Sequence, residues 1–333
     1  MEVASAVMSG SNGELAAIET IRRGLPEPPE GEIWIGDDAA VVACPAGKSL
    51  LLAADAVVEG VHFDLDLVDA ADVGWKALVV NVSDIAAMGG RPLHALVTVV
   101  GATAVMIEGL VRGLAEAAAA YDCAVVGGDL SSGPRLVITV AITGTTGDRE
   151  AVLRSNARPG DLLFVTGALG RSAAGLRALR AGKGGDATLL AGPAGTSRGA
   201  GAPKASLDLA AAYRRPVARV PEGLAASAGG ATAMIDVSDG LGIDLDRLAT
   251  ASGVGVVLDA VPTAEGSTRE EALGGGEDYE LVFAARDPGA IERAFEAAGL
   301  RAPIRIGACV ADPRLRLIGT EPLGASGWEH RLS

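Results

Sequence analysis

The sequence predicts an α+β chain of two domains, and three observations lead to that prediction. The chain has 333 residues, a length that corresponds to about two average domains. Hydrophobic residues make up 49% of it and aromatic residues only 3%, so the cores must be built from Ala, Val, Leu and Ile. Apolar runs of strand length alternate irregularly with helical stretches, which favours mixed sheets over a regular βαβ array.

Strands are predicted where short apolar runs are bounded by Gly, Pro, Asp or Ser, and in chain order they cover 50–54, 93–100, 123–127, 135–143, 162–166, 233–236, 254–259, 279–284 and 303–308. Helices are predicted where apolar residues recur at helical spacing, over 72–88, 105–120, 171–181, 206–213, 218–229, 241–252 and 288–298. The segments 123–127 and 135–143 are expected to pair around the SSGP turn. We therefore expect an N-terminal mixed sheet with helices on one face and a C-terminal α/β sandwich.

The helix predicted at 72–88 is apolar nearly all round, with one stripe formed by Trp75, Leu78, Val79, Val82, Ile85 and Ala86. Such a helix is normally buried. Asp84 projects from its second side, and a buried carboxylate must be paired or bound to a metal. A cap or salt bridge and a metal ligand are both open readings of this residue.

A domain boundary is predicted near 148–160, where TTGDRE ends one strand and ARPGD turns into the next. The expected organisation is a disordered N-terminus over 1–12, an N-terminal domain over 13–148 and a C-terminal domain over 149–333. The stretch 182–204 is rich in Gly, Ala and Pro and has little to bury, so it is predicted to be a flexible insertion.

Charge and cysteine content narrow the function. The formal net charge is −14, which argues against nucleic acid or an anionic membrane as partner; a phosphorylated ligand would need metal ions to bridge the repulsion. The three cysteines are far apart, which excludes a zinc ribbon, makes a disulfide framework improbable and fits a reducing cytosol. The N-terminus lacks the basic region of a secretory signal, and the longest uncharged apolar stretch, between Arg91 and Glu108, is too short to span a bilayer.

Six short motifs place acidic residues at turns or at the ends of apolar segments: Gly36-Asp37-Asp38, Ala54-Asp55, Ser83-Asp84, Gly127-Gly128-Asp129, Asp236-Val237-Ser238-Asp239-Gly240 and Gly276-Glu277-Asp278. Taken singly, each is also compatible with a plain turn, a hairpin end or a helix N-cap. Carboxylates beside glycines are also suited to holding hard cations such as Mg²⁺ around a phosphate. Asp236 and Asp239, at the start of a helix, suit such a cluster best.

In this order, the motifs resemble the thiamine-monophosphate kinase family, part of the superfamily that includes aminoimidazole ribonucleotide synthetase and selenophosphate synthetase. The matching stretches span nearly the whole chain: IGDDAAV, AADAVVEGVHF, WKALVVNVSDIAAMGGRP, VGGDLSSG, RSNARPGD, TGALGRSAAGL, IDVSDGL, GGGEDYEL and GWEH. The resemblance implies two α+β domains and a homodimer in which two N-terminal sheets pair into a barrel. It also implies transfer of the γ-phosphoryl group of ATP to thiamine monophosphate, giving thiamine diphosphate and ADP. The cysteines and the acidic charge separately predict a cytoplasmic protein with neither nucleic acid nor membrane as partner.

The resemblance also implies roles for particular residues. Several Mg²⁺ ions would be held by Asp38, Asp55, Asp84, Asp129, Asp236 and Asp239, with a contribution from Ala54. ATP would be contacted by Gly128, Asp129, Arg154 and Ser238. The thiamine substrate would be contacted by His62, Glu277 and Trp328, whose indole could stack on the cationic thiazolium. No acid or base catalyst is implied, because the acceptor is already an anionic phosphate oxygen and phosphoryl transfer depends mainly on positioning and charge neutralisation.

One departure from the family pattern bears on the metal site. Ala53-Ala54 precede Asp55 where the family often has two threonines whose oxygens bind metal, so only backbone carbonyls remain there. Two alternatives therefore stay open beside the kinase. One is another ATP-dependent enzyme of the same superfamily. The other is a catalytically silent relative that binds thiamine phosphates or nucleotides.

Overall fold

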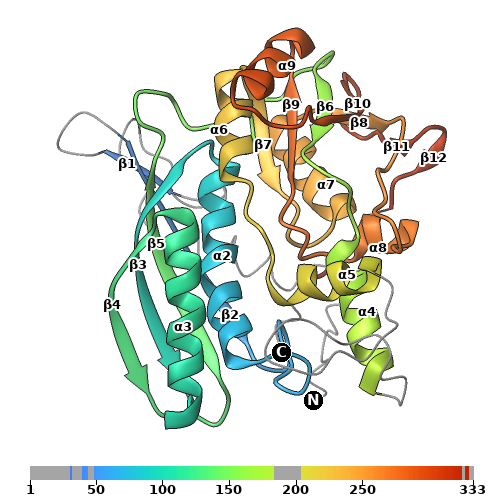
Figure 1. Ribbon diagram of the computed structural model, residues 1–333. Helices are drawn as coiled ribbons and strands as arrows, with labels where there is room; N and C mark the ends of the chain where they lie inside the picture. The colour runs from blue at the N-terminus through green and yellow to red at the C-terminus, as the bar shows by residue number, and fades with distance from the viewer. Residues whose placement is uncertain (1–30, 32–39, 44–48, 184–203, 325–326, 330–333) are drawn as a thin grey trace, which may run out of the picture.

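The computed structural model describes residues 31, 40–43, 49–183, 204–324 and 327–329. Two β-sheets form its two halves, with a long helix between them (Figure 1). The mixed α/β, two-domain architecture expected from the sequence is confirmed. Predicted and observed elements agree within a few residues over most of the described chain. The structure also contains three elements that were not predicted: the short helix α8 (Arg269–Gly274) and the short strands β11 (Arg316–Ile318) and β12 (Glu321–Pro322).

Within the described residues, the N-terminal sheet has five strands in the order β1 (Ala40–Ala43), β2 (Ser49–Val58), β5 (Val137–Thr145), β3 (Arg91–Val100) and β4 (Ala124–Ser131). Helices α2 (Ala70–Ala87) and α3 (Ala104–Tyr121) lie together on one face of it (Figure 1). The strands alternate accordingly: Val57, Val97, Ile138 and Val140 are buried on the helix side. The other face of the sheet carries no helix among the residues that the structure describes.

The predicted pairing of 123–127 with 135–143 is wrong. Strand β4 pairs in parallel with β3, and β5 lies antiparallel between β2 and β3. The physical reason is the difference in apolar content between the two strands. Strand β5 contributes Ile138, Val140 and Ile142 to the core, so it belongs at the centre, whereas every residue of β4 is exposed. A glycine-containing strand that packs little is better tolerated at a sheet edge.

Helix α2 is buried nearly all round, as its sequence predicts, because it packs on both domains. Its N-terminal part contacts α3 and the N-terminal sheet, and its last residues, Ala86 and Ala87, belong to a core shared with the C-terminal domain. Asp69 caps its start by accepting a hydrogen bond from the backbone N–H of Asp72. Polar side chains near its C-terminal end are thereby held between the domains.

The C-terminal sheet has seven strands among the described residues, in the order β12 (Glu321–Pro322), β11 (Arg316–Ile318), β8 (Gly255–Leu258), β10 (Ile304–Val310), β6 (Leu162–Val165), β9 (Leu281–Ala285) and β7 (Ala231–Asp236). One face packs on α6 (Val220–Ala228) and α9 (Pro288–Ala297), where Phe164, Phe283 and Phe295 stack. The opposite face packs on α7 (Leu241–Ser252). Helices on both faces of one sheet make the predicted α/β sandwich.

Three further helices lie beside the junction of the domains: α4 (Arg171–Lys183), α5 (Lys204–Arg214) and α8 (Arg269–Gly274). The predicted disordered N-terminus 1–12 and residues 184–203 of the predicted insertion lie outside the described residues. Among the helices that the structure does describe, none has both the length and the apolar character needed to cross a bilayer.

Candidate active site between the two domains

The C-terminal end of α2 joins two of the acidic motifs. The Asn81 side-chain oxygen accepts a hydrogen bond of 2.8 Å from the backbone N–H of Asp55 on β2. The Ser83 hydroxyl donates a 2.6 Å hydrogen bond to the Asp236 carboxylate at the end of β7. Both Ser83 and Asp236 are buried, so this bond links the two domains in the interior. Asp84 follows Ser83 in the last turn of α2 and is half-buried.

The two C-terminal acidic loops lie against one another. Backbone hydrogen bonds run from Val237 N–H to the Glu280 carbonyl and from Tyr279 N–H to the Val237 carbonyl, at 2.7 and 3.0 Å. A third, of 2.6 Å, runs from Glu277 N–H to the Ser238 carbonyl. Gly276 has a φ of 69°, and a Cβ there would lie 2.8 Å from the same carbonyl, so the close approach requires glycine.

Tyr279 marks the point where acidic residues from both domains meet. Burial raises the pKa of its phenol well above the usual value, and the charges of Glu277, Asp55, Asp236 and Asp239 raise it further. These four carboxylates therefore lie within electrostatic range of one buried phenol. Asp55 comes from the N-terminal sheet and the other three from the C-terminal loops, so the fold brings these predicted site residues together.

The backbone around Glu277 is held in an unusual conformation. Glu277 and Tyr279 have φ values of 58° and 51°, in the left-handed region that costs non-glycine residues free energy. The Glu277 carboxylate forms a 2.7 Å ion pair with Lys76, and Lys76 also donates a 3.0 Å hydrogen bond to the His62 carbonyl. Two residues matched to substrate contacts, His62 and Glu277, are thus linked through a lysine that sequence reasoning passed over.

Asp239 and Trp328 are neighbours. The backbone N–H of Trp328 donates a 2.9 Å hydrogen bond to the Asp239 carbonyl, and the indole is 52% exposed, so it is available for stacking. The Asp239 carboxylate forms a 2.5 Å ion pair with Arg247, which also pairs with the buried Asp244. Sequence reasoning missed Arg247; its position on α7, three residues after Asp244, was the available signal.

The contacts of Asp278 stabilise the fold rather than the candidate site. Its carboxylate accepts hydrogen bonds from the backbone N–H groups of Gly170 and Ser172, at 2.6 and 3.2 Å, at the N-terminus of α4. Burial raises its pKa to about 6 despite these bonds. Within the acidic motif 276–278, Glu277 therefore lies at the domain junction, whereas Asp278 binds the N-terminus of α4.

The structure does not bring Gly128 and Asp129 to the other acidic residues within one chain. In the sheet register Asp129 on β4 stands beside Thr98, whereas Asp55 lies on β2, three strands away and on the helix-covered face. Asp129 faces the open side of the sheet and accepts a hydrogen bond from Ser131. Gly128 is required by β3, because a Cβ would lie 1.7 Å from the Val97 carbonyl oxygen.

The remaining predicted residues fall in three places. Ala54 is exposed on β2 opposite Ala141, on the open face of the sheet. The backbone carbonyl of Arg154 accepts a 2.7 Å hydrogen bond from Ser252 at the C-terminal end of α7, the end away from Ser238. Asp38 lies outside the described residues.

The donor set fits Mg²⁺ in its chemistry. Asp55, Asp236 and Asp239 offer the carboxylate oxygens that Mg²⁺ prefers. Within the described residues, however, no three His, Cys, Asp or Glu side chains are close enough to form a complete metal cage. Mg²⁺ usually binds through one or two carboxylates together with water and substrate phosphates, which is compatible with an open arrangement of this kind. Cys123 and Cys309 do not suit thiol chemistry, because burial raises the pKa of their thiols to about 11 and 12.

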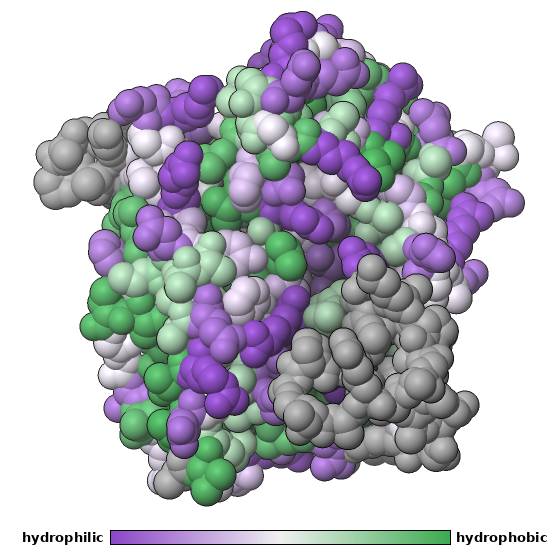
Figure 2. Space-filling model, viewed as in Figure 1, coloured by the Kyte–Doolittle hydropathy of each residue, from purple (hydrophilic) through white to green (hydrophobic). Residues whose placement is uncertain are grey.

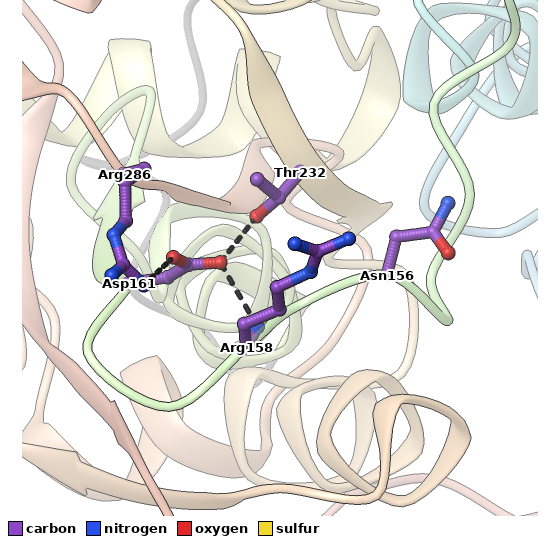
Figure 3. Close-up of a pocket in the computed structure, with 5 residues that line it drawn as sticks. All are labelled: Asn156, Arg158, Asp161, Thr232 and Arg286. Atoms are coloured by element: carbon purple, nitrogen blue, oxygen red, sulfur yellow. Dashed lines mark hydrogen bonds and ion pairs between the residues drawn. The ribbon is translucent and has the colours of Figure 1, made fainter.

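A cavity of about 620 Å³ lies away from this site. Figure 3 shows its lining residues, including Arg158, Asp161, Thr232 and Arg286. Thr232 lies at the start of β7 and Asp236 at its end, so this cavity and the acidic residues lie at opposite ends of the strand. The Asp161 carboxylate accepts hydrogen bonds from Arg158 N–H and the Thr232 hydroxyl, which secures the loop before β6.

Two smaller cavities, of about 230 and 190 Å³, lie beside the acidic residues, and Glu277 lines both. Tyr213, Leu176 and Arg180 line the first with it, and Arg219 and Glu280 line the second. Arg219 forms a 2.5 Å ion pair with the buried Glu280. The site therefore combines a carboxylate-rich centre with adjoining cavities of mixed apolar and charged lining.

Comparison with known proteins agrees with this architecture. Residues 36–146 match the model of the AIR synthase related protein N-terminal domain, and residues 158–320 match the C-terminal domain of the same family. The thiamine-monophosphate kinase of Mycobacterium tuberculosis (strain H37Rv) is 36% identical over 95% of this chain and 91% of its own length. That of Bacillus subtilis (strain 168) is 36% identical over 75% of this chain and 77% of its own.

Solved structures show the same similarity. AaThiL complexed with AMPPCP and TMP superposes with a TM-score of 0.80 at 31% identity, over 96% of this chain and 97% of that one. The two-domain fold and the acidic junction thus define a protein of the AIR synthase related class. The chain belongs to this family, and within it to the group of the thiamine-monophosphate kinases.

Proposed function

We propose that this protein is an ATP-dependent kinase that transfers the γ-phosphoryl group of ATP directly to the phosphate of thiamine monophosphate, giving thiamine diphosphate and ADP. One observation in the structure supports it most: α2 joins acidic residues of both domains, through the hydrogen bond between Asn81 and Asp55 and the one between Ser83 and Asp236. Relatives named thiamine-monophosphate kinase, similar over most of the chain, support the choice of substrate.

The proposed site works by holding two anionic substrates in line. Asp55, Asp84, Asp236 and Asp239 would hold Mg²⁺, which when bound neutralises phosphate charge in phosphoryl transfer. Ser83 keeps the Asp236 carboxylate oriented, and Asn81 fixes the backbone at Asp55. No general base is needed, because the acceptor phosphate oxygen is already anionic. His62, Glu277 and Trp328 would bind the thiamine part, and Ser238 the nucleotide. Arg154, whose backbone lies at the other end of α7, would reach the nucleotide only through its long side chain.

We also propose that two copies of the chain associate through the open face and β4 edge of the N-terminal sheet, as a barrel. On this face Ala54, Ala141 and Leu96 lie side by side on three neighbouring strands, and Leu96 is 52% exposed. Val126 and Leu130 on β4 are 58% and 68% exposed, and apolar side chains at this edge are visible on the left of Figure 2. A face that is apolar and uncovered fits a second copy. Asp129 lies on the same face, so in the dimer it would face the partner rather than Asp55 of its own chain.

Incubation of the purified protein with ATP, Mg²⁺ and thiamine monophosphate tests the kinase directly. We expect thiamine diphosphate and ADP in equal amounts, and we expect Asp84→Asn to abolish turnover while the unfolding temperature stays near that of the wild type. Glu265→Gln, an exposed acidic residue outside the site, is the matched control and should retain activity. Near-normal turnover in Asp84→Asn would show that the metal cluster has been misplaced.

A catalytically silent binding protein is the second candidate, and Ala53-Ala54 is the observation that favours it. Both residues lie on β2 next to Asp55 and offer only backbone oxygens there. Nucleotide binding without product in the same assay would support this candidate and exclude the kinase. A cytoplasmic location remains a prediction from the scattered cysteines.

A further inference from the structure

Lys76 is a buried cation that joins both domains at the candidate site. It belongs to α2, is 2% exposed and meets three partners. Its ammonium group lies 2.7 Å from the Glu277 carboxylate, 3.0 Å from the His62 carbonyl and 4.2 Å from the centre of the Tyr213 ring. The Tyr213 hydroxyl lies 3.5 Å from the same His62 carbonyl. The three N–H donors of an ammonium group are therefore matched by three described partners.

These contacts place Lys76 directly behind the wall of a cavity. Tyr213 and Glu277 both line the cavity of about 230 Å³ beside α4, and Lys76 is in contact with both without being among the lining residues. Glu277 also lines the neighbouring cavity of about 190 Å³. The lysine itself is thus too deep to touch a ligand in the cavity, whereas its partners Tyr213 and Glu277 line it.

The conformation of Glu277 needs such support. Its φ of 58° is unfavourable for a glutamate, and its backbone is held by the hydrogen bond to Ser238. The side chain is about a quarter exposed, so without a fixed partner the carboxylate would be free to turn toward solvent. The ion pair with a buried ammonium sets its direction at the cavity wall.

We propose that Lys76 is a positioning residue for substrate binding: by holding the Glu277 carboxylate, the His62 carbonyl and the Tyr213 ring in one arrangement, it shapes the cavity that receives the cationic heterocycle of the substrate. This inference rests on the proposed kinase function. Lys76 acts on the thiamine side of the site only, because none of its described contacts is with Asp55, Asp236 or Asp239.

The test is the steady-state kinetics of Lys76→Met, which keeps most of the apolar side chain and removes the ammonium group. We expect the KM for thiamine monophosphate to rise at least about tenfold, as for loss of a charge-assisted contact. The KM for ATP and kcat should change less than about threefold. In the double variant Lys76→Met/Glu277→Gln, the KM for thiamine monophosphate should equal that of Glu277→Gln alone, since the lysine acts through the glutamate.

Arg316→Met is the matched control. Arg316 is a half-buried cation whose ion pair with Asp246 is 2.6 Å long, and it lines neither cavity. Its loss should lower the unfolding temperature and leave both KM values unchanged. If Lys76→Met does not fold, Lys76→Gln keeps a donor for the His62 carbonyl, removes only the charge and carries the same expectations.

Three results would overturn the inference: an unchanged KM for thiamine monophosphate, an equal rise in both KM values, or additive effects in the double variant. Each would show that Lys76 only stabilises the fold. These results are distinct from failure of the proposed function, in which the wild-type protein itself forms no thiamine diphosphate.

Discussion

At the scale of single residues, the site depends on small polar groups at the end of α2. The Ser83 hydroxyl donates a hydrogen bond to the Asp236 carboxylate across the domain junction, and both groups are buried. A buried carboxylate that loses a donor keeps its desolvation cost. The sequence singled out Asp84 and Asp236 but gave no sign that Ser83 connects the two motifs, because their separation of 153 residues is bridged only by folding.

Ser83→Ala should therefore lower both stability and activity. We expect the free energy of unfolding to fall by about 1–3 kcal/mol and kcat/KM to fall by at least about tenfold, because Asp236 would no longer be held in place. Thr146→Val is a suitable control: its buried hydroxyl donates a hydrogen bond of 2.6 Å to a turn carbonyl far from the site. Urea unfolding and the coupled ADP assay provide the measurements. Equal activity losses in both variants would contradict a specific function for Ser83.

Asp278 should make stability depend on pH. Burial raises its folded-state pKa to about 6 from the usual 3.8. Between these values the folded protein binds a proton that the unfolded chain has released, so this residue makes stability fall as pH rises from about 4 to about 6. Asn at this position does not titrate. The free energy of unfolding of the wild type minus that of Asp278→Asn should thus be larger at pH 4 than at pH 6.5, and a constant difference would argue against the raised pKa.

At the scale of elements, glycines set the distance between α2 and α3. A Cβ on Gly113 would lie 1.8 Å from the Ala71 carbonyl oxygen, and one on Gly74 would lie 2.2 Å from the Leu110 carbonyl oxygen. The helices therefore approach more closely than side chains would allow. The sequence predicted both helices within a few residues, but a glycine in a helix is equally compatible with a flexible or weak position. Only the packing of α2 against α3 shows why these positions are glycine.

Gly113→Ala should destabilise the protein although alanine is the better helix former. Helix propensity favours the change by about 1 kcal/mol, whereas separating two packed helices costs about 1–3 kcal/mol or more. We expect a net loss of stability in thermal unfolding. Ala119→Gly, at an exposed position of the same helix, is the converse control and should cost about 1 kcal/mol from propensity alone. A stabilised Gly113→Ala variant would show that the helices can move apart freely.

The strand order is the element-level feature that sequence reasoning got wrong. The short separation of 123–127 and 135–143 in the sequence favours a hairpin between them, because strands that follow one another in the chain often pair. The structure instead places β5 between β2 and β3, since Ile138, Val140 and Ile142 complete the core under α2. Strand order depends on which faces can be buried together, and local sequence does not encode that.

At the scale of the whole molecule, the open face of the N-terminal sheet predicts association. Leu96→Lys would place a charge at the centre of that face, opposite Ala141, and should convert a dimer to a monomer in sedimentation velocity. Turnover should fall with it, because Gly128 and Asp129 would lie at the same proposed interface. Val111→Lys is the control, since Val111 is 56% exposed on α3, on the helix side. A fully active Leu96→Lys monomer would contradict the proposal that association completes the site.

The sequence by itself determined the fold class, most of the elements and the acidic motifs, because hydrophobic periodicity and Gly–Asp turns are local patterns. The tertiary structure decided which of those motifs meet. It joined Asp55 to Asn81, Ser83 to Asp236 and Glu277 to Lys76 across the domain junction, and it placed Asp129 on the opposite face of the sheet. The physical reason is that burial is a property of the whole chain: a serine or a lysine acquires its function only when folding removes it from water beside a particular carboxylate.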